Sequence, residues 1–258
     1  MSTNPLAGKT VLVTRAKEQA QDLSLLIAKQ GGTAIEVPLI AFKAVSSKEL
    51  ETAIHNVRTY QWLIFTSANG VRYFIKELQR YQYDLKQLPL KIAVVGTKTE
   101  QMLECYDVKA DLLPVDFVAE GLVEALSGQV KKGDRVLVAR GNLGRIELIT
   151  GLTALGAMVD DVSVYRTIHP PEAKDQLEAV LASLKSTDYI TFTSSSTVHH
   201  FIKIIQAKGM DVKAKIACIG PIAARTAKKY GLTVTLMPST YTIEHLVDQL
   251  ILDSKENV

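Results

Sequence analysis

The sequence has few cysteines and no long apolar run, and each shortage excludes a class of protein. Its 258 residues include only two cysteines, Cys105 and Cys218, which excludes a disulfide-stapled scaffold and favours a reducing compartment. We expect both to be small buried side chains. No apolar stretch reaches the roughly 18 residues that a membrane span needs. The start, MSTNPLAGKT, lacks the features of a secretory signal, so we expect a cytoplasmic protein without membrane contact.

An excess of charge of one sign is also missing. Thirty Lys and Arg against 27 Asp and Glu leave a formal charge of +3, and no block of basic residues occurs. Nucleic acid is therefore not an expected partner. The hydrophobic fraction of 47% and charged fraction of 22% are ordinary for a globular protein, and the length allows one to two domains.

Familiar catalytic and cofactor motifs are absent as well. There is no Walker-type phosphate loop, no His-Glu-x-x-His and no Gly-x-Ser-x-Gly, and residues 141–144 form an incomplete dinucleotide fingerprint. His199 and His200 are adjacent, so on a helix they project about 100° apart and cannot easily share a metal. The other three histidines are isolated and are expected at the surface or in packing: His55, His169 and His245. After these exclusions, the remaining classes of function are a cofactor-free reaction and the binding of a ligand without chemistry.

What the sequence does contain is an internal repeat. Gly8–Arg15 (GKTVLVTR) recurs 125 positions later as Gly133–Arg140 (GDRVLVAR). Three more blocks recur in the same order: Trp62–Leu78 as Tyr189–Ile205 at an offset of 127, and Ile92–Gly96 as Ile216–Gly220 and Pro114–Leu126 as Pro238–Leu250 at an offset of 124. A period this long indicates two similar domains rather than a solenoid.

Each repeated block has a short apolar run, then small residues, then an amphipathic helix. The runs Val11–Val13, Leu63–Phe65 and Ile92–Val95 are too short for core helices and predict buried parallel strands. In Val71–Leu78 the apolar residues recur at i, i+3, i+4 and i+7, which predicts a helix. The predicted fold class is therefore α/β, with two similar doubly wound parallel-sheet domains of the flavodoxin or Rossmann kind.

Two segments marked by proline, 36–45 and 161–171, interrupt this alternation. Both are expected to be extended, because proline disfavours helix at the residue before it. They can pair as strands or serve as linkers. The repeats alone do not assign each half of the chain to a domain.

The ends of the predicted strands carry the candidate site. Ligands of open parallel sheets bind beyond the carboxyl ends of the strands, where a helix N-terminus offers free amide N–H groups to anions. The candidates are Thr66, Ser67, Ala68, Asn69, Gly96, Thr97, Lys98, Thr99, Ser194, Ser195, Ser196, Thr197, Gly220, Pro221, Ile222 and Ala223. Arg15 and Arg140 hold the same place in the two repeats and suit carboxylates. The alternative interpretations are plain helix caps and surface salt bridges.

Taken in order along the chain, several blocks resemble the uroporphyrinogen-III synthase family. The resemblance runs from about Val11 to Leu250 through VLVTR, WLIFTSANGV, AVVGTKT, P-x-x-F-x-AEGL, RG-x-x-GR, VYRT, ITFTSSSTV and IACIGPIAARTA. It implies two α/β domains joined by a two-stranded linker. Residues 1–37 and 170–258 would form one domain, 40–166 the other, and 36–45 and 161–171 the linker strands.

The resemblance also implies a reaction. Such enzymes are lyases that cyclise hydroxymethylbilane, a linear tetrapyrrole with carboxylates on all its rings, to uroporphyrinogen III, in the tetrapyrrole pathway towards haem, sirohaem and cobalamin. Water is lost and ring D is inverted, and no metal or organic cofactor takes part. The implied partners are this small-molecule substrate and, transiently, the preceding pathway enzyme, and the implied state is a monomer.

Tyr165 matches the tyrosine of the family's V-Y-x-T strand, which is the favoured proton donor. A tyrosine hydroxyl stays protonated at neutral pH, as a donor must. The alternative is a tyrosine that packs at a seam between domains. The family often has threonine after the Gly-Pro turn, whereas Ile222 and Ala223 stand here. The implied carboxylate grip at this turn therefore rests on backbone N–H groups.

Three other functions fit parts of the pattern. A bilobal binding protein would close on an anionic metabolite without making product. A regulator with a degenerate synthase fold would be expected to lose Tyr165 or the strand-end loops, and both are present. A nucleotide-binding α/β enzyme is disfavoured by the missing glycine-rich phosphate loop.

Overall fold

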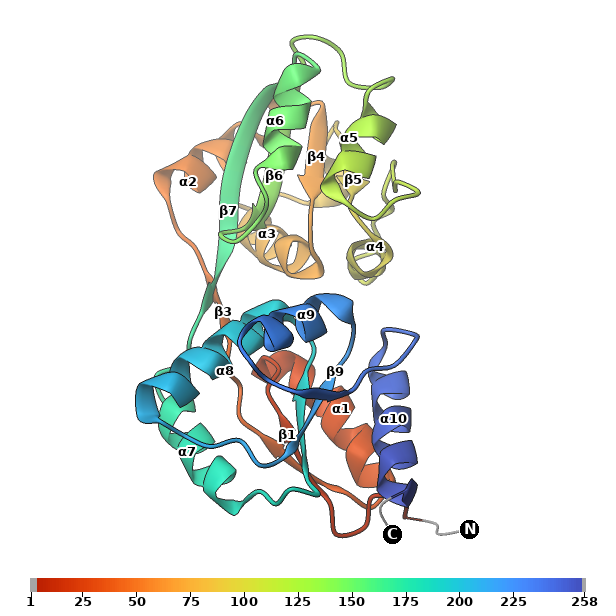
Figure 1. The fold of residues 1–258 in the computed structure, drawn as a ribbon. Helices are drawn as coiled ribbons and strands as arrows, with labels where there is room; N and C mark the ends of the chain where they lie inside the picture. The colour runs from red at the N-terminus through yellow and green to blue at the C-terminus, as the bar shows by residue number, and fades with distance from the viewer. Residues whose placement is uncertain (1–3, 257–258) are drawn as a thin grey trace. The chain divides into compact units, whose positions relative to one another are not determined.

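The computed structural model describes residues 4–256. The chain divides into two compact units (Figure 1). Unit 1 combines Met1–Ala41 with Ile168–Val258, and unit 2 is Phe42–Thr167. No helix in the described part of the chain is long and apolar enough to cross a membrane.

Unit 1 is a five-stranded sheet with helices on both faces. The strand order is β10-β9-β8-β1-β2, and the pairs are parallel. The strands are β1 (Thr10–Val13), β2 (Thr33–Glu36), β8 (Tyr189–Phe192), β9 (Lys215–Cys218) and β10 (Val234–Leu236). The helices are α1 (Lys17–Lys29), α7 (Ala173–Ser183), α8 (Ser195–Lys208), α9 (Pro221–Lys229) and α10 (Ile243–Glu256). One apolar cluster joins the sheet to α1 and α10, and another joins it to α7, α8 and α9.

Unit 2 repeats this plan. Its strand order is β3-β7-β6-β4-β5. The strands are β3 (Ala41–Ala44), β4 (Trp62–Phe65), β5 (Lys91–Val94), β6 (Arg135–Gly141) and β7 (Met158–Ile168). The helices are α2 (Lys48–His55), α3 (Ala68–Arg80), α4 (Thr97–Glu104), α5 (Ala119–Leu126) and α6 (Glu147–Ala154), with two 3₁₀ turns at Val57–Thr59 and Leu85–Gln87.

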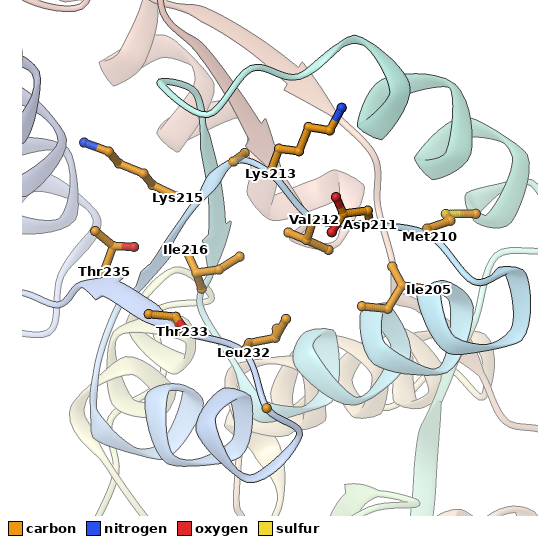
Figure 2. Close-up of a pocket in the computed structure, with 12 residues that line it drawn as sticks. Ile205, Met210, Asp211, Val212, Lys213, Lys215, Ile216, Leu232, Thr233 and Thr235 are labelled. Atoms are coloured by element: carbon orange, nitrogen blue, oxygen red, sulfur yellow. The ribbon is translucent and has the colours of Figure 1, made fainter.

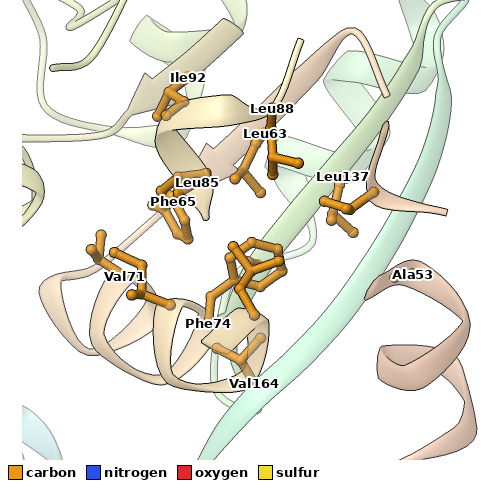
Figure 3. Close-up of a cluster of buried hydrophobic side chains, with 14 of the residues drawn as sticks. Ala53, Leu63, Phe65, Val71, Phe74, Leu85, Leu88, Ile92, Leu137 and Val164 are labelled. Atoms are coloured by element: carbon orange, nitrogen blue, oxygen red, sulfur yellow. The ribbon is translucent and has the colours of Figure 1, made fainter. Parts of the chain in front are cut away.

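The strands β4, β5 and β6 of unit 2 are mostly buried on both faces, which explains their continuous apolar sequences. Leu63 and Phe65 of β4 join the cluster that packs against α2, α3 and α4 (Figure 3). Trp62 and Ile64 of the same strand join the cluster against α5 and α6. Successive side chains of a strand point to opposite faces, so both sets need to be apolar. The predicted doubly wound α/β fold is confirmed.

The repeats and the units divide the chain differently. The segment β1-α1-β2 begins the first repeat but lies in unit 1, beside strands of the second repeat. Its counterpart β6-α6-β7 begins the second repeat but lies in unit 2. The registers agree, because Val13 pairs with Glu36 and, 125 positions later, Val138 pairs with Asp161. Each unit is therefore assembled from one part of each repeat.

Two local predictions need correction, and one helix begins without a side-chain cap. The helix expected directly after Arg140 begins only at Glu147, because β6 continues to Gly141 and a turn follows. Helix α1 has Ala16 at its N-cap, so no side chain caps it. Cys105 is exposed, because it follows the last turn of α4 rather than facing a core, whereas Cys218 on β9 is buried as expected.

Candidate functional site

The strand ends of unit 1 meet at a cavity. Since β8 and β9 are parallel neighbours, helices α8 and α9 begin side by side at the same edge of the sheet. A cavity of about 430 Å³ lies there, lined by Thr193, Ser194, Ser195, Ile219, Gly220, Pro221, Ile222, Ala223 and Tyr241. It therefore brings together the predicted loops at 194–197 and 220–223.

Ser194 is the N-cap of α8, and its hydroxyl accepts a hydrogen bond from the Thr197 N–H at 3.3 Å. The first amides of the helix, on Ser195 and Ser196, have no backbone acceptor one turn back. Gly220 is the N-cap of α9, which leaves the Ile222 and Ala223 amides in the same position. These N–H groups and the positive ends of both helix dipoles favour an anion at this edge.

Unit 2 has the same arrangement. Ser67 caps α3 and accepts a hydrogen bond from the Gly70 N–H at 3.0 Å, and Gly96 is the N-cap of α4. Strands β4 and β5 are parallel neighbours, so these two helices also begin at one sheet edge. The first amides, on Ala68, Asn69, Thr97 and Lys98, have no acceptor one turn back in their helices.

Burial limits what the predicted side chains can contact. The side chains of Thr99, Thr197 and Ala223 are buried, with exposed fractions of 4%, 0% and 2%. The Thr197 hydroxyl already donates to the Ser194 carbonyl oxygen at 2.8 Å. Thr66, Asn69, Ser195, Ser196 and Pro221 are partly exposed, and Thr97, Lys98 and Ile222 are exposed. The side chains at these three positions are therefore not available to a ligand. The N–H groups of Thr99 and Thr197 are also taken, by the Gly96 carbonyl oxygen and the Ser194 hydroxyl.

Arg15 lies at the carboxyl end of β1, next to β8. Its Nε atom is buried and has no hydrogen-bond partner among residues 4–256, and no salt bridge involves it there. Burial lowers the pKa of Arg15, and the charge of Asp22 partly offsets this. A half-buried guanidinium without a carboxylate partner is costly, so this position suits an incoming anion.

Arg140, the counterpart of Arg15, already has a partner. Its Nε and Nη2 atoms each donate to one carboxylate oxygen of Asp161, both at 2.6 Å. The hydrogen bonds to Asp161 raise the pKa of Arg140. The structure thus pairs Arg140 within the sheet, and we leave it out of the proposed carboxylate-binding set.

Tyr165 lies on β7 and reaches the first turn of α3. Its hydroxyl is 3.1 Å from the Ser67 hydroxyl. Its ring stacks on Tyr73 of α3 at a centroid distance of 5.5 Å and lies nearly perpendicular to the Phe42 ring at a centroid distance of 5.6 Å. The ring is half-buried, and its polar end lies at a helix N-terminus. A tyrosine held in this way can donate a proton next to a group that binds anions.

The family model described as uroporphyrinogen-III synthase HemD matches residues 7–248. The chain belongs to the uroporphyrinogen-III synthase family. A uroporphyrinogen-III synthase of Synechococcus elongatus is 35% identical over 256 residues, covering 96% of both chains. One of Chlorobaculum parvum is 29% identical and covers 90% of this chain and 94% of its own. The resemblance noted in the sequence is thereby confirmed.

Solved structures of the same family share the fold. A mutant uroporphyrinogen III synthase from the extremely thermophilic bacterium Thermus thermophilus has a TM-score of 0.67 at 15% identity, covering 97% of this chain and all of that one. A uroporphyrinogen-III synthetase from Helicobacter pylori has a TM-score of 0.63 at 16% identity, with coverages of 95% and 98%. Two-domain α/β architecture is thus shared by this family across distant sequences.

Sequence reasoning missed Tyr241, which lines the cavity of unit 1. A Cβ atom on Gly220 would lie 3.1 Å from its ring, so the ring covers the N-cap of α9. Phe117, its counterpart 124 positions earlier, lies beside Gly96 in the same way. Both rings are 53% exposed. The aromatic residue that recurs at this place in the repeated block Pro114–Leu126 is the sequence signal that could have identified both rings.

The histidines differ in part from expectation. His169 is not isolated, because its ring stacks on His200 at a centroid distance of 3.7 Å. Burial lowers the pKa of His200 to about 4, and the charges of His169 and Lys203 act in the same direction. Among the described residues, no group of three His, Cys, Asp or Glu side chains lies close enough to hold a metal ion.

A second cavity of unit 1, of about 450 Å³, lies at the opposite edge of the sheet (Figure 2). It is lined at the start of β9 and beside β10, by Lys213, Lys215 and Thr233 among others. The Lys215 ammonium is already paired with both carboxylate oxygens of Asp253, at 2.6 and 2.9 Å. This cavity is less favourably placed for a ligand than the cavity at the starts of α8 and α9, because parallel sheets bind ligands at the carboxyl ends of their strands.

Proposed function

We propose that this chain converts hydroxymethylbilane to uroporphyrinogen III, with loss of water and inversion of ring D. The observation that carries the proposal is the family match over residues 7–248. The chemistry of the strand ends supports it, since a substrate with carboxylates on every ring needs several anion-binding positions. The chain offers helix N-termini at the carboxyl edge of both sheets.

In this proposal the carboxylates bind mainly to backbone amides. The donors are the free N–H groups in the first turns of α3, α4, α8 and α9, as the helix N-termini of both units favour. They belong to Ala68, Asn69, Thr97, Lys98, Ser195, Ser196, Ile222 and Ala223. Arg15 supplies a charged donor in unit 1, and the absence of any described partner for its Nε supports this role. A bidentate hydrogen bond between guanidinium and carboxylate also orients the bound group.

Tyr165 is the proposed general acid for the departing hydroxyl group. Ser67 Oγ accepts the Gly70 N–H, so its own hydrogen is available to the Tyr165 oxygen 3.1 Å away. In that arrangement the Tyr165 hydrogen is free to move to the substrate. The N-terminus of α3 then stabilises the negative charge that develops on the phenol oxygen.

The remaining chemistry belongs to the substrate. Loss of water gives an azafulvene cation, and the substituted carbon of the terminal ring attacks it to form a spiro intermediate. Fragmentation and recombination at the other carbon invert the ring. The pyrrole supplies the electrons, so the protein's task is to hold the chain in a reactive shape until the ends join.

The deciding experiment supplies enzymatically made hydroxymethylbilane and separates the oxidised products by isomer. We expect the type III isomer well above the spontaneous type I background. The type I isomer alone would disprove the proposed activity, and binding without product would identify a binding protein instead.

A Tyr165→Phe variant tests the acid. We expect kcat to fall by about 10²-fold, below the top of the roughly 10²–10⁴-fold range for a positioned acid, because the leaving group departs readily. KM should stay close to the wild-type value, since Tyr165 is not in the proposed carboxylate-binding set. Unchanged turnover at saturating substrate would remove Tyr165 from the mechanism.

We also propose that the protein acts as a cytoplasmic monomer that receives substrate from the preceding pathway enzyme. The two unpaired cysteines support a reducing compartment. Sedimentation at working concentration tests the monomer, and a stable dimer would overturn it.

A further inference from the structure

Gly141, the last residue of β6, lies against the Tyr165 ring. A Cβ atom at this position would be 2.5 Å from Tyr165 Cζ and 2.7 Å from its hydroxyl oxygen. Real contacts of a Cβ atom are longer than 3.0 Å, so a side chain at 141 would displace the phenol or the strand. The absence of a side chain at residue 141 therefore makes room for the hydroxyl end of Tyr165.

The backbone does not itself demand glycine here. The positive-φ glycines of the described chain are Gly8, Gly31, Gly133, Gly156, Gly209 and Gly231, and Gly141 is not one of them. In unit 1 the residue 125 positions earlier is Ala16, which is fully buried. The same offset replaces Tyr165 with Ile40. At the matching sequence positions, unit 1 thus combines a residue that has a Cβ atom with isoleucine in place of the tyrosine.

Other contacts leave the ring little freedom to move aside. The backbone of Tyr165 is held beside β6, because its carbonyl oxygen accepts a hydrogen bond from the Asn142 N–H at 3.2 Å. The register of the β6–β7 ladder also shifts between Arg140 and Gly141, so that Gly141 pairs with Tyr165. The ring is stacked on Tyr73, whose hydroxyl donates to the Phe42 carbonyl oxygen at 3.0 Å. A displaced phenol would therefore lose its hydrogen bond to the Ser67 hydroxyl.

We propose that Gly141 is a positioning residue that sets the Tyr165 hydroxyl at the N-terminus of α3. This inference rests on the proposed role of Tyr165 as general acid. A misplacement of about 1 Å costs up to about 10²-fold in rate, because a proton donor acts only within hydrogen-bond reach. Gly141→Ala should therefore lower kcat tenfold to a hundredfold and leave KM almost unchanged.

The test is a double-mutant cycle with Gly141→Ala and Tyr165→Phe, measured as kcat and KM for type III product. If Gly141 acts through the hydroxyl, adding Gly141→Ala to Tyr165→Phe lowers kcat no further. The matched control is Gly128→Ala in the same unit, where a Cβ atom meets nothing within 4 Å, and we expect it to keep full activity. An equal loss from Gly141→Ala in both backgrounds, or no loss from it, would overturn the inference.

The outcomes separate this inference from the proposed function. If Tyr165→Phe alone keeps full kcat, the acid role fails and the inference fails with it. If Tyr165→Phe loses activity and Gly141→Ala does not, only the inference fails. Should Gly141→Ala not fold, the pair Gly141→Ala with Tyr165→Ile, which copies Ala16 and Ile40 of unit 1, should restore the fold. Failure to restore it would also overturn the inference.

Discussion

Corresponding strands of the two units each have an arginine at the carboxyl end, Arg15 in unit 1 and Arg140 in unit 2, and the two arginines have different partners. Arg140 is held by Asp161 through two hydrogen bonds of 2.6 Å. The residue that corresponds to Asp161 in unit 1 is Glu36, which instead accepts a hydrogen bond from Ser24 of α1 at 2.5 Å. The position of Ser24 is taken by apolar Ile149 in unit 2. Arg140 is thus paired with a carboxylate of the neighbouring strand, whereas the corresponding carboxylate of unit 1 is held by a helix hydroxyl and makes no ion pair with Arg15 among the described residues.

The largest expected effect separates the two arginines. Arg15→Met should raise KM for hydroxymethylbilane about tenfold to a hundredfold, because a hydrogen bond to a charged group contributes about 1.5–3 kcal/mol. Arg140→Met should leave KM within about twofold and lower the free energy of unfolding by about 1 kcal/mol through loss of the Asp161 pair. Steady-state kinetics and urea unfolding measure both. An equal rise of KM in the two variants would contradict the comparison.

A second contrast concerns the rings that α3 and α8 present. Tyr73 of α3 stacks on Tyr165, and His200, its counterpart on α8, stacks on His169. Burial lowers the pKa of His200 to about 4 in the folded state, whereas the pKa in the unfolded chain is about 6.5. Between about pH 4 and pH 6.5 the unfolded state therefore binds more protons than the folded state. The free energy of unfolding should therefore have its full value above pH 6.5 and fall by about 2 kcal/mol, after allowance for solvent screening, as the pH drops to 4.

Thermal unfolding between about pH 4 and 7.5 measures this loss. His200→Tyr, which places the unit 2 residue in unit 1, should flatten the pH dependence whatever it does to stability at neutral pH. An unchanged slope in His200→Tyr would assign the acid sensitivity to another group.

The smallest expected effect compares the two capping serines. Ser67→Ala and Ser194→Ala should each lower the free energy of unfolding by about 1 kcal/mol, because each removes an N-cap. Only Ser67→Ala should also lower kcat, by a few-fold, since the Ser67 hydroxyl contacts Tyr165 while the Ser194 hydroxyl contacts Ser196 and Thr197. Urea midpoints and kcat test this, and an equal loss of kcat in both variants would argue against it.

Local patterns in the sequence predicted the strands, the sheet class and the serine caps. Runs such as Trp62–Phe65 and the hydroxyl residues after them carry that information within a few residues. The different states of Arg15 and Arg140 could not be predicted in this way, because Asp161 and Glu36 come from a neighbouring strand and Ser24 from a helix. The contact between Gly141 and Tyr165 likewise depends on a register shift in the β6–β7 ladder, which leaves no mark in either segment alone.

The division of each repeat between two units sets an order of events during synthesis. All of unit 2 lies between residues 42 and 167, so it can fold as soon as that stretch has left the ribosome. The opening segment β1-α1-β2 has to wait for about 150 further residues, or roughly 8–30 seconds of translation, before its partner strand β8 exists. During that interval the apolar faces of β1 and α1 are uncovered, which makes the amino-terminal segment the part of a nascent chain most exposed to aggregation or to chaperones.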